Sequence, residues 1–121
     1  MVTLVRKGQR LCITKQSLIE AWVVATRPRD VNGHGYSANF AAQGIAKIKR
    51  LFHVLSEDEA IHAEWERLVV AHQVHGRAAH DTRIVAAMNV HRVSRLLTFN
   101  TDDFKRYAPG IEVIHPKDVV A

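Results

Sequence analysis

The sequence predicts an α/β fold in which helices cover a small, mostly parallel sheet. Short apolar runs, such as residues 11–14 and 95–99, have the length and composition of buried strands. They alternate with longer segments in which apolar residues recur at helical spacing. This alternation is typical of a parallel sheet with helices on both faces. At 121 residues, of which 47% are hydrophobic, the chain is expected to form one domain over residues 1–121.

The first half of the chain contains signals for two helices. Thr14 follows the first apolar run and is expected to cap a helix that continues to about Thr26. Pro28 ends this helix, because the residue before a proline avoids the helical conformation. Ser37 is expected to cap the second helix, after a loop that contains Asn32, Gly33 and Gly35.

The second half of the chain continues the alternation. Val54 and Leu55 indicate a short strand, and Ser56 with Glu59 matches a capping box for a third helix. The elements expected after it are a helix from Asp81 to about His91, a strand over residues 95–99, a helical turn over 103–107 and a strand over 111–114.

Composition narrows the class of protein. No apolar run reaches the ~18 residues of a membrane-spanning helix, and the single cysteine, Cys12, fits a reducing compartment. We therefore expect a cytoplasmic protein without membrane contact. The chain carries 17 Lys and Arg against 12 Asp and Glu, a net charge of +5. This excess favours a polyanionic partner such as nucleic acid, although ordinary solvated helix faces also account for it.

Candidate functional residues gather at the end of the predicted strand 95–99 and at the start of the predicted helix 81–91. Asp81 opens the predicted helix 81–91, and Asn100, Asp102 and Asp103 follow the strand. Ligands of open α/β sheets bind where strands end, and clustered oxygen ligands suit a hard cation such as Mg2+ or Mn2+. Each of these residues alone also fits a helix cap or a solvated first-turn acid.

Glu20 is the third acidic element, because it lies in a helix that is otherwise apolar from Leu18 to Ala25. A helix that is hydrophobic all round is expected to be buried, and a buried carboxylate should be paired or bound to a metal. The alternative is that Gln16 and Glu20, four residues apart, form a thin solvated stripe.

Other site chemistries find less support. Histidines are frequent, but the chain has no HExxH pattern and no cysteine partners for zinc. It also lacks the GxSxG, GxxxxGK[ST] and GxGxxG motifs of serine hydrolases, P-loop proteins and Rossmann domains.

The chain contains the segments LCITKQSLIEAWVVATRP, NGHG, HDTRIVAAMNVH, LLTFNTDDF and IEVIHP. Together these five segments resemble the PIN-domain family, in particular the VapC-like toxin ribonucleases of toxin–antitoxin pairs. The resemblance implies a three-layer α/β/α sandwich that hydrolyses RNA with Mg2+ or Mn2+. Carried over by motif, it implies that Glu20, Asp81 and Asp103 hold the metal. Asn100, which stands where many members have a last acid, would position water or substrate. It also implies a VapB-like antitoxin as partner and a homodimer.

The chain departs from the family at its beginning. The family starts with a central strand that ends in a D-x-N motif, whose Asp is the first metal ligand, and this chain has no such strand segment ahead of residues 11–14. We interpret residues 2–6 as the tail of the helix that normally precedes the strand at 11–14. The 121-residue chain is then expected to be nearly inactive and poorly stable, unless residues 1–5 or another chain take the place of that strand.

Two other functions are compatible with these residues. The chain could be a catalytically impaired, PIN-like module that only binds an antitoxin or RNA. It could also be a small-molecule α/β domain in which the acids are only helix caps. Metal titration separates the latter from the other two, and RNA cleavage separates the nuclease from the binding module.

Overall fold

The computed structural model describes residues 4–7 and 10–119, and it has the predicted α/β class. The strands are β1 (Leu4–Lys7), β2 (Arg10–Ile13), β3 (His53–Val54), β4 (Arg95–Leu97) and β5 (Glu112–Ile114). The α-helices are α1 (Lys15–Thr26), α2 (Ala38–Leu51), α3 (Glu59–Ala71) and α4 (Ala78–Val90). Short 3-10 helices are η1 (Arg29–Val31), η2 (Thr101–Tyr107) and η3 (Pro116–Asp118).

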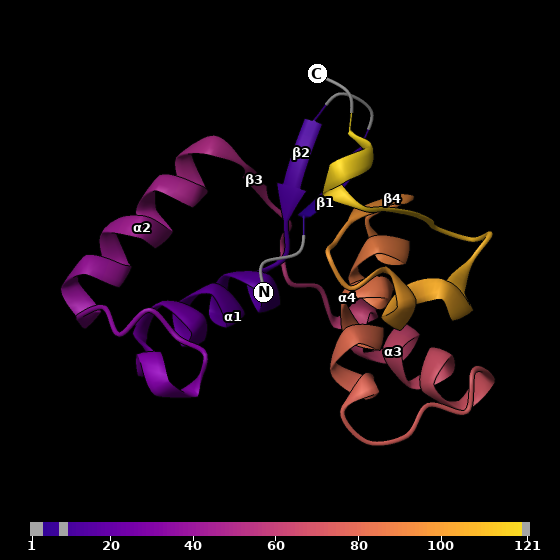
Figure 1. The fold of residues 1–121 in the computed structure, drawn as a ribbon. Coiled ribbons are helices and arrows are strands. Elements are labelled where there is room, and N and C mark those ends of the chain that lie inside the picture. The colour runs from indigo at the N-terminus through magenta and orange to yellow at the C-terminus, as the bar shows by residue number, and fades with distance from the viewer. Residues whose placement is uncertain (1–3, 8–9, 120–121) are drawn as a thin grey trace.

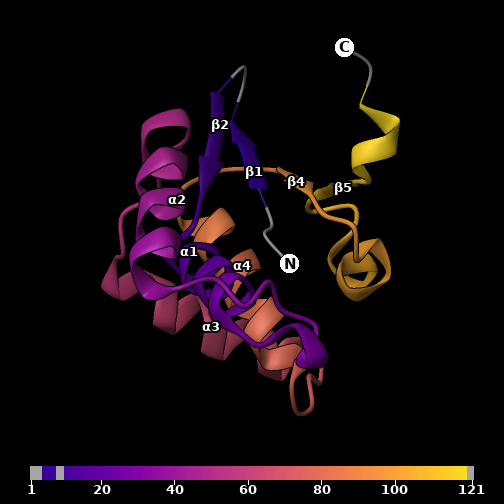
Figure 2. The ribbon, with the colours of Figure 1, turned by 60° about the vertical axis from the view of Figure 1, so that its left-hand side comes forward.

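The described strands form one mixed sheet of five strands in the order β3-β2-β1-β4-β5 (Figures 1 and 2). β2 pairs with β3 and β4 pairs with β5 in parallel, as the alternation of strands and helices predicts. β1 is antiparallel to both of its neighbours. The expectation of a mostly parallel sheet therefore applies only to the two outer pairs.

β1 corrects the interpretation of the N-terminal segment. Residues 4–6 belong to a strand and not to the tail of a helix, whereas residues 2 and 3 lie outside the described part of the chain. Val5 is fully buried and pairs with Cys12 on one side and Leu96 on the other. β2 and β4, the strands on either side of β1, therefore both have a hydrogen-bonding partner. This removes the reason for expecting a poorly stable sheet.

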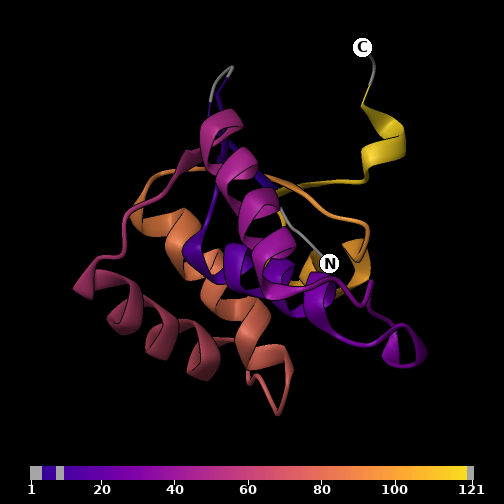
Figure 3. The ribbon, with the colours of Figure 1, turned by 90° about the vertical axis from the view of Figure 1, so that its left-hand side faces the viewer.

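The hydrophobic core is distributed unequally around the sheet. α1 and α2 lie on one side of β1 and β2, and α3 and α4 lie on the other (Figures 1 and 3). The main hydrophobic cluster joins the strands to α3 and α4, with Ile61, Leu68 and Met88 among its buried members. The side covered by α3 and α4 therefore holds most of the core.

α1 is much more exposed than its sequence predicts. Only Ser17 and Ala21 of this helix are buried, whereas Ile19 is 66% exposed and Trp22 36% exposed. The expectation that an all-apolar helix is buried on every side is wrong here, because α1 packs mainly against α2 and neither helix is covered on its outer face.

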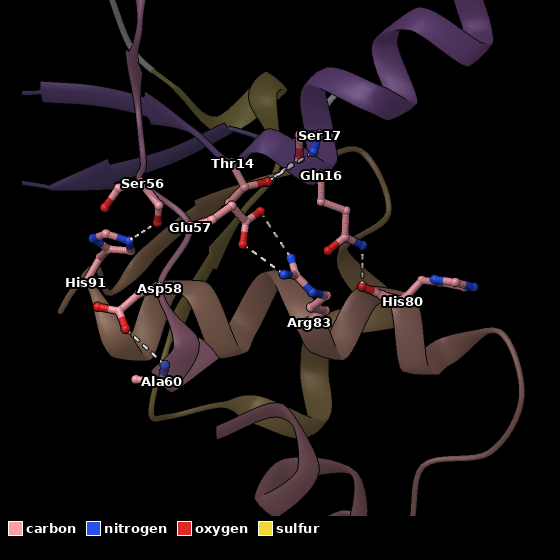
Figure 4. Close-up of polar contacts among 10 residues, drawn as sticks. All are labelled: Thr14, Gln16, Ser17, Ser56, Glu57, Asp58, Ala60, His80, Arg83 and His91. Atoms are coloured by element: carbon pink, nitrogen blue, oxygen red, sulfur yellow. Dashed lines mark hydrogen bonds and ion pairs between the residues drawn. The ribbon is translucent and has the colours of Figure 1, made fainter. Parts of the chain in front are cut away.

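Helix caps were predicted with mixed success. Thr14 and Ser37 accept hydrogen bonds from backbone N–H groups at the starts of α1 and α2, as expected. The predicted Ser56–Glu59 capping box is wrong, because Asp58 caps α3 by accepting a hydrogen bond of 2.9 Å from the Ala60 N–H (Figure 4). Asp is as good a cap as Ser, so Ser56 and Asp58 could not be ranked from sequence.

Candidate functional site

The four residues predicted to carry the chemistry border one cavity of about 490 Å³. Glu20 reaches it from α1, Asp81 from α4, and Asn100 and Asp103 from the segment that follows β4. Glu20 and Asp103, which are 83 positions apart in the chain, are thus brought to one place. Asp102, the other acid of the predicted cluster, does not line this cavity and instead pairs with Lys105 at 2.6 Å.

Sheet topology explains why these segments meet. In the register of the sheet, Leu4 lies opposite both Ile13 of β2 and Leu97 of β4. Because β2 and β4 both run antiparallel to β1, their C-terminal ends lie at the same edge of the sheet. α1 starts directly after β2, and η2 starts shortly after β4. The site therefore lies at the carboxyl ends of strands, as is typical of open α/β sheets.

Local hydrogen bonds shape the segment that presents Asn100 and Asp103. The hydroxyl of buried Thr98 accepts a hydrogen bond of 3.1 Å from the Asn100 N–H. The Asp103 N–H in turn donates to the Asn100 carbonyl at 3.1 Å. Phe104 is 2% exposed and anchors η2 in the core, so its neighbour Asp103 is left on the exposed side of this helix.

Asp81 is the half-buried member of the acidic group. α4 begins at Ala78, so Asp81 lies within the first turn and not at the helix start as predicted. Burial raises the pKa of the Asp81 carboxyl, and the negative charge of Asp103 raises it further. Glu20 adds a smaller increase, whereas His80 and Arg77 act in the opposite direction on this pKa. The three carboxylates are therefore close enough to interact electrostatically.

Glu20 lines the cavity from an exposed position, because its helix is not enclosed as the sequence predicts. Its placement depends on which face of α1 turns toward α4. Gln16, one turn earlier, lines the same cavity and donates from Nε2 to the His80 carbonyl at 2.6 Å. Gln16 and Glu20 thus share a face, as their spacing predicts, but that face borders the cavity.

The side-chain oxygens at the cavity are of the chemical type that binds a hard divalent cation. Carboxylate and amide oxygens are the ligands that Mg2+ and Mn2+ prefer, and both Glu20 and Asp103 are exposed at the cavity. As these side chains stand, the described residues contain no group of three His, Cys, Asp or Glu that could hold a metal ion. The metal-binding roles of Glu20, Asp81 and Asp103 therefore stay a prediction.

Two buried residues behind the acids of the cavity were missed by sequence analysis. The Tyr107 hydroxyl lies 2.6 Å from the Thr82 hydroxyl, and both side chains are buried. Thr82 directly follows Asp81, and Tyr107 is in the same 3-10 helix as Asp103. Their separation of 25 positions leaves no local pattern from which the contact could be predicted.

No protein-family model matches this chain, and no curated protein sequence matches it either. The resemblance to PIN domains thus rests on the sequence motifs and stays a prediction. Among the described residues, no helix is long and apolar enough to cross a membrane.

Proposed function

We propose that this protein is a metal-dependent endoribonuclease of the VapC-like type, with its active site in the cavity between α1, α4 and η2. The observation that carries the proposal is that Glu20, Asp81 and Asp103 border one cavity and interact electrostatically. Ionised carboxylates around one cavity repel one another, and a bound divalent cation relieves that repulsion.

In this proposal, Glu20, Asp81 and Asp103 hold Mg2+ or Mn2+, and Asn100 positions water or substrate through its amide. When bound, such a cation activates water as a nucleophile and neutralises charge on the scissile phosphate. The raised pKa of Asp81 means that protons compete with the cation at this carboxylate. Metal binding and cleavage should therefore weaken as the pH falls.

Phosphate contacts in the proposal come from basic residues at the cavity. Arg77 and His80 are exposed, line the cavity and lower the pKa of Asp81, so both act on the electrostatics of the site. Arg77 can donate two hydrogen bonds to a phosphate, which orients an RNA backbone next to the carboxylates.

One observation favours the alternative of an impaired, PIN-like binding module. The central strand β1 consists of Leu4, Val5, Arg6 and Lys7 and carries no acid, whereas the resemblance places the first metal ligand on a central strand. A site with fewer carboxylates binds a cation more weakly. In the alternative, the cavity binds RNA or an antitoxin and cleavage is slow or absent.

Partners follow from the same proposal. An antitoxin segment that carries Arg or Lys would complement the three acids of the cavity. A homodimer would cover apolar side chains that are exposed in the single chain. Residues 37–70 contribute the exposed side chains of Phe40, Leu51 and Val70, and α1 adds Ile19 and Trp22.

Metal-dependent cleavage of a labelled single-stranded RNA tests the proposal. We expect cleavage with Mn2+ or Mg2+ that stops when the metal is chelated, and a loss of roughly 100-fold or more in Asp81→Asn. Asp118→Asn is the matched control, because Asp118 is an exposed acid that does not line the cavity.

Three results would separate the alternatives. Cleavage that persists in chelator, or in Asp81→Asn, would contradict the proposed active site. RNA binding without cleavage would favour the binding module. If the protein binds neither RNA nor Mn2+, both the nuclease and the binding module are excluded. The acids are then only helix caps and surface charges.

A further inference from the structure

Asp81 lies between two residues that each take part in a contact with another element of the site. Its predecessor His80 accepts a hydrogen bond from α1, and its successor Thr82 forms one with η2. These are the same two elements that carry Glu20 and Asp103. The hydrogen bonds therefore connect all three acid-bearing elements at the turn that presents Asp81.

The contact with η2 has a defined direction. The Thr82 hydroxyl has one proton, and it donates to the Ala78 carbonyl at 2.9 Å. The Tyr107 hydroxyl, 2.6 Å away, must then donate to the Thr82 oxygen. The Tyr107 ring also packs edge-on against His72, with ring centroids 4.9 Å apart. Tyr107 is thereby held in place independently of its hydroxyl, and its O–H group fixes the distance between η2 and the first turn of α4.

The contact with α1 is made by Gln16. Figure 4 shows its amide reaching across from α1 to the His80 carbonyl, a hydrogen bond of 2.6 Å. The opposite amide orientation would place two oxygens against each other, so Nε2 must face this carbonyl. Few other contacts join α1 to α4, because α1 packs mainly on α2. The position of Glu20 relative to Asp81 thus depends strongly on this amide.

From this geometry we propose that Gln16 and Tyr107 are positioning residues for the carboxylates, Gln16 for Glu20 and Tyr107 for Asp103. The inference rests on the proposed function, since the property that they control is the spacing of the metal ligands. Neither side chain is assigned a bond to the cation or to substrate. Loss of a hydrogen bond that orients a ligand typically weakens metal affinity by ~10–100-fold.

Mn2+ affinity of the full chain, measured by calorimetric titration without RNA, tests this inference. We expect Gln16→Ala and Tyr107→Phe each to weaken Mn2+ binding about 10-fold while the protein stays folded. Matched controls exist for both. Gln73→Ala removes a similar amide hydrogen bond, to the Val70 carbonyl, outside the cavity, and Tyr36→Phe alters an exposed tyrosine. Both controls should bind Mn2+ as the wild type does.

Variants of Thr82 separate positioning from general stability. Thr82→Ser keeps the hydroxyl that accepts from Tyr107 and should retain Mn2+ affinity, whereas Thr82→Val should lose it as Tyr107→Phe does. Combining Thr82→Val with Tyr107→Phe should add no further loss, because both remove the same hydrogen bond. Additive losses, or unchanged Mn2+ affinity in Gln16→Ala and Tyr107→Phe, would overturn the inference.

Hydrogen exchange tests this inference independently of the proposed function. The Asp103 N–H, bonded to the Asn100 carbonyl at 3.1 Å, should exchange faster in Tyr107→Phe, while amides in the middle of α3 keep their wild-type rates. If the wild type fails to bind Mn2+, the proposed metal site fails, and faster exchange at Asp103 would still support the connection between η2 and α4. Unchanged exchange at Asp103 would overturn the role of Tyr107 in either case.

Discussion

Asp81 combines two opposing electrostatic effects. An acid in the first turn of a helix is favoured by the helix dipole, and α4 places Asp81 in this position. Burial nevertheless raises the pKa of its carboxyl, as do the charges of Asp103 and Glu20. The folded protein therefore holds a proton on Asp81 at a higher pH than the unfolded chain does. Ionised Asp81 costs folding free energy at neutral pH, as is common for groups in functional sites.

Asp81→Asn should consequently stabilise the protein at neutral pH. The stability linked to Asp81 is fully present below the ordinary pKa of an aspartate and is lost as the pH rises through the raised pKa. We expect a higher urea midpoint for Asp81→Asn than for the wild type at about pH 7, and little difference at about pH 3. Asp118→Asn, at an exposed acid, should change the free energy of unfolding by no more than about 0.5 kcal/mol. A lower midpoint for Asp81→Asn at neutral pH would contradict the electrostatic account.

At the scale of elements, the sheet depends on the short strand β1. Val5 is completely buried, and its neighbours Cys12 and Leu96 are 1% and 0% exposed, so the three form a closed apolar row. A four-residue strand with two basic residues gives little strand signal by itself. Its pairing depends on contacts with β2 and β4, which local patterns within β1 do not report.

The importance of β1 can be measured through Val5→Ala. The substitution removes two buried carbon atoms and leaves a cavity, so we expect a loss of about 2 kcal/mol in the free energy of unfolding. Val70→Ala is the matched control, because the same atoms are removed from a side chain that is 68% exposed. Chemical denaturation of both variants checks the difference. Equal stability of the two would show that β1 does not contribute to the folded core.

The sequence predicted the parts of the site that have a local sequence pattern, and it did not predict those that depend on tertiary contacts. Asp81, Asn100 and Asp103 were identified because each stands beside a recognisable element boundary. The C-terminal ends of β2 and β4 lie at the same edge of the sheet because both strands run antiparallel to β1. The exposure of α1 could not be predicted from the sequence. Apolar residues on a helix indicate only a preference for burial, and they do not show whether another layer covers the helix. The contact between Tyr107 and Thr82 is a tertiary packing event without a sequence pattern.

Across the whole molecule, charge is segregated along the chain. Residues 31–56 contain three Lys and Arg and no acid, whereas residues 57–66 contain five acids. An RNA chain is therefore attracted to some surfaces and repelled by others. At the cavity, Arg77 is the basic residue that is always charged, next to three carboxylates. Phosphate binding there depends on a single strong positive charge until a cation is bound.

Arg77→Ala should weaken RNA binding almost equally for different sequences, because a phosphate contact carries no base information. For single strands, the slope of log affinity against log salt falls by about 0.7 for each phosphate contact that is lost. Fluorescence anisotropy in the Asp81→Asn background, which prevents cleavage, measures this slope. Lys49→Ala, an exposed basic residue of α2 that does not line the cavity, should keep the original slope. If Arg77→Ala also keeps it, the RNA backbone does not pass Arg77, and the proposed path of the substrate over the cavity is wrong.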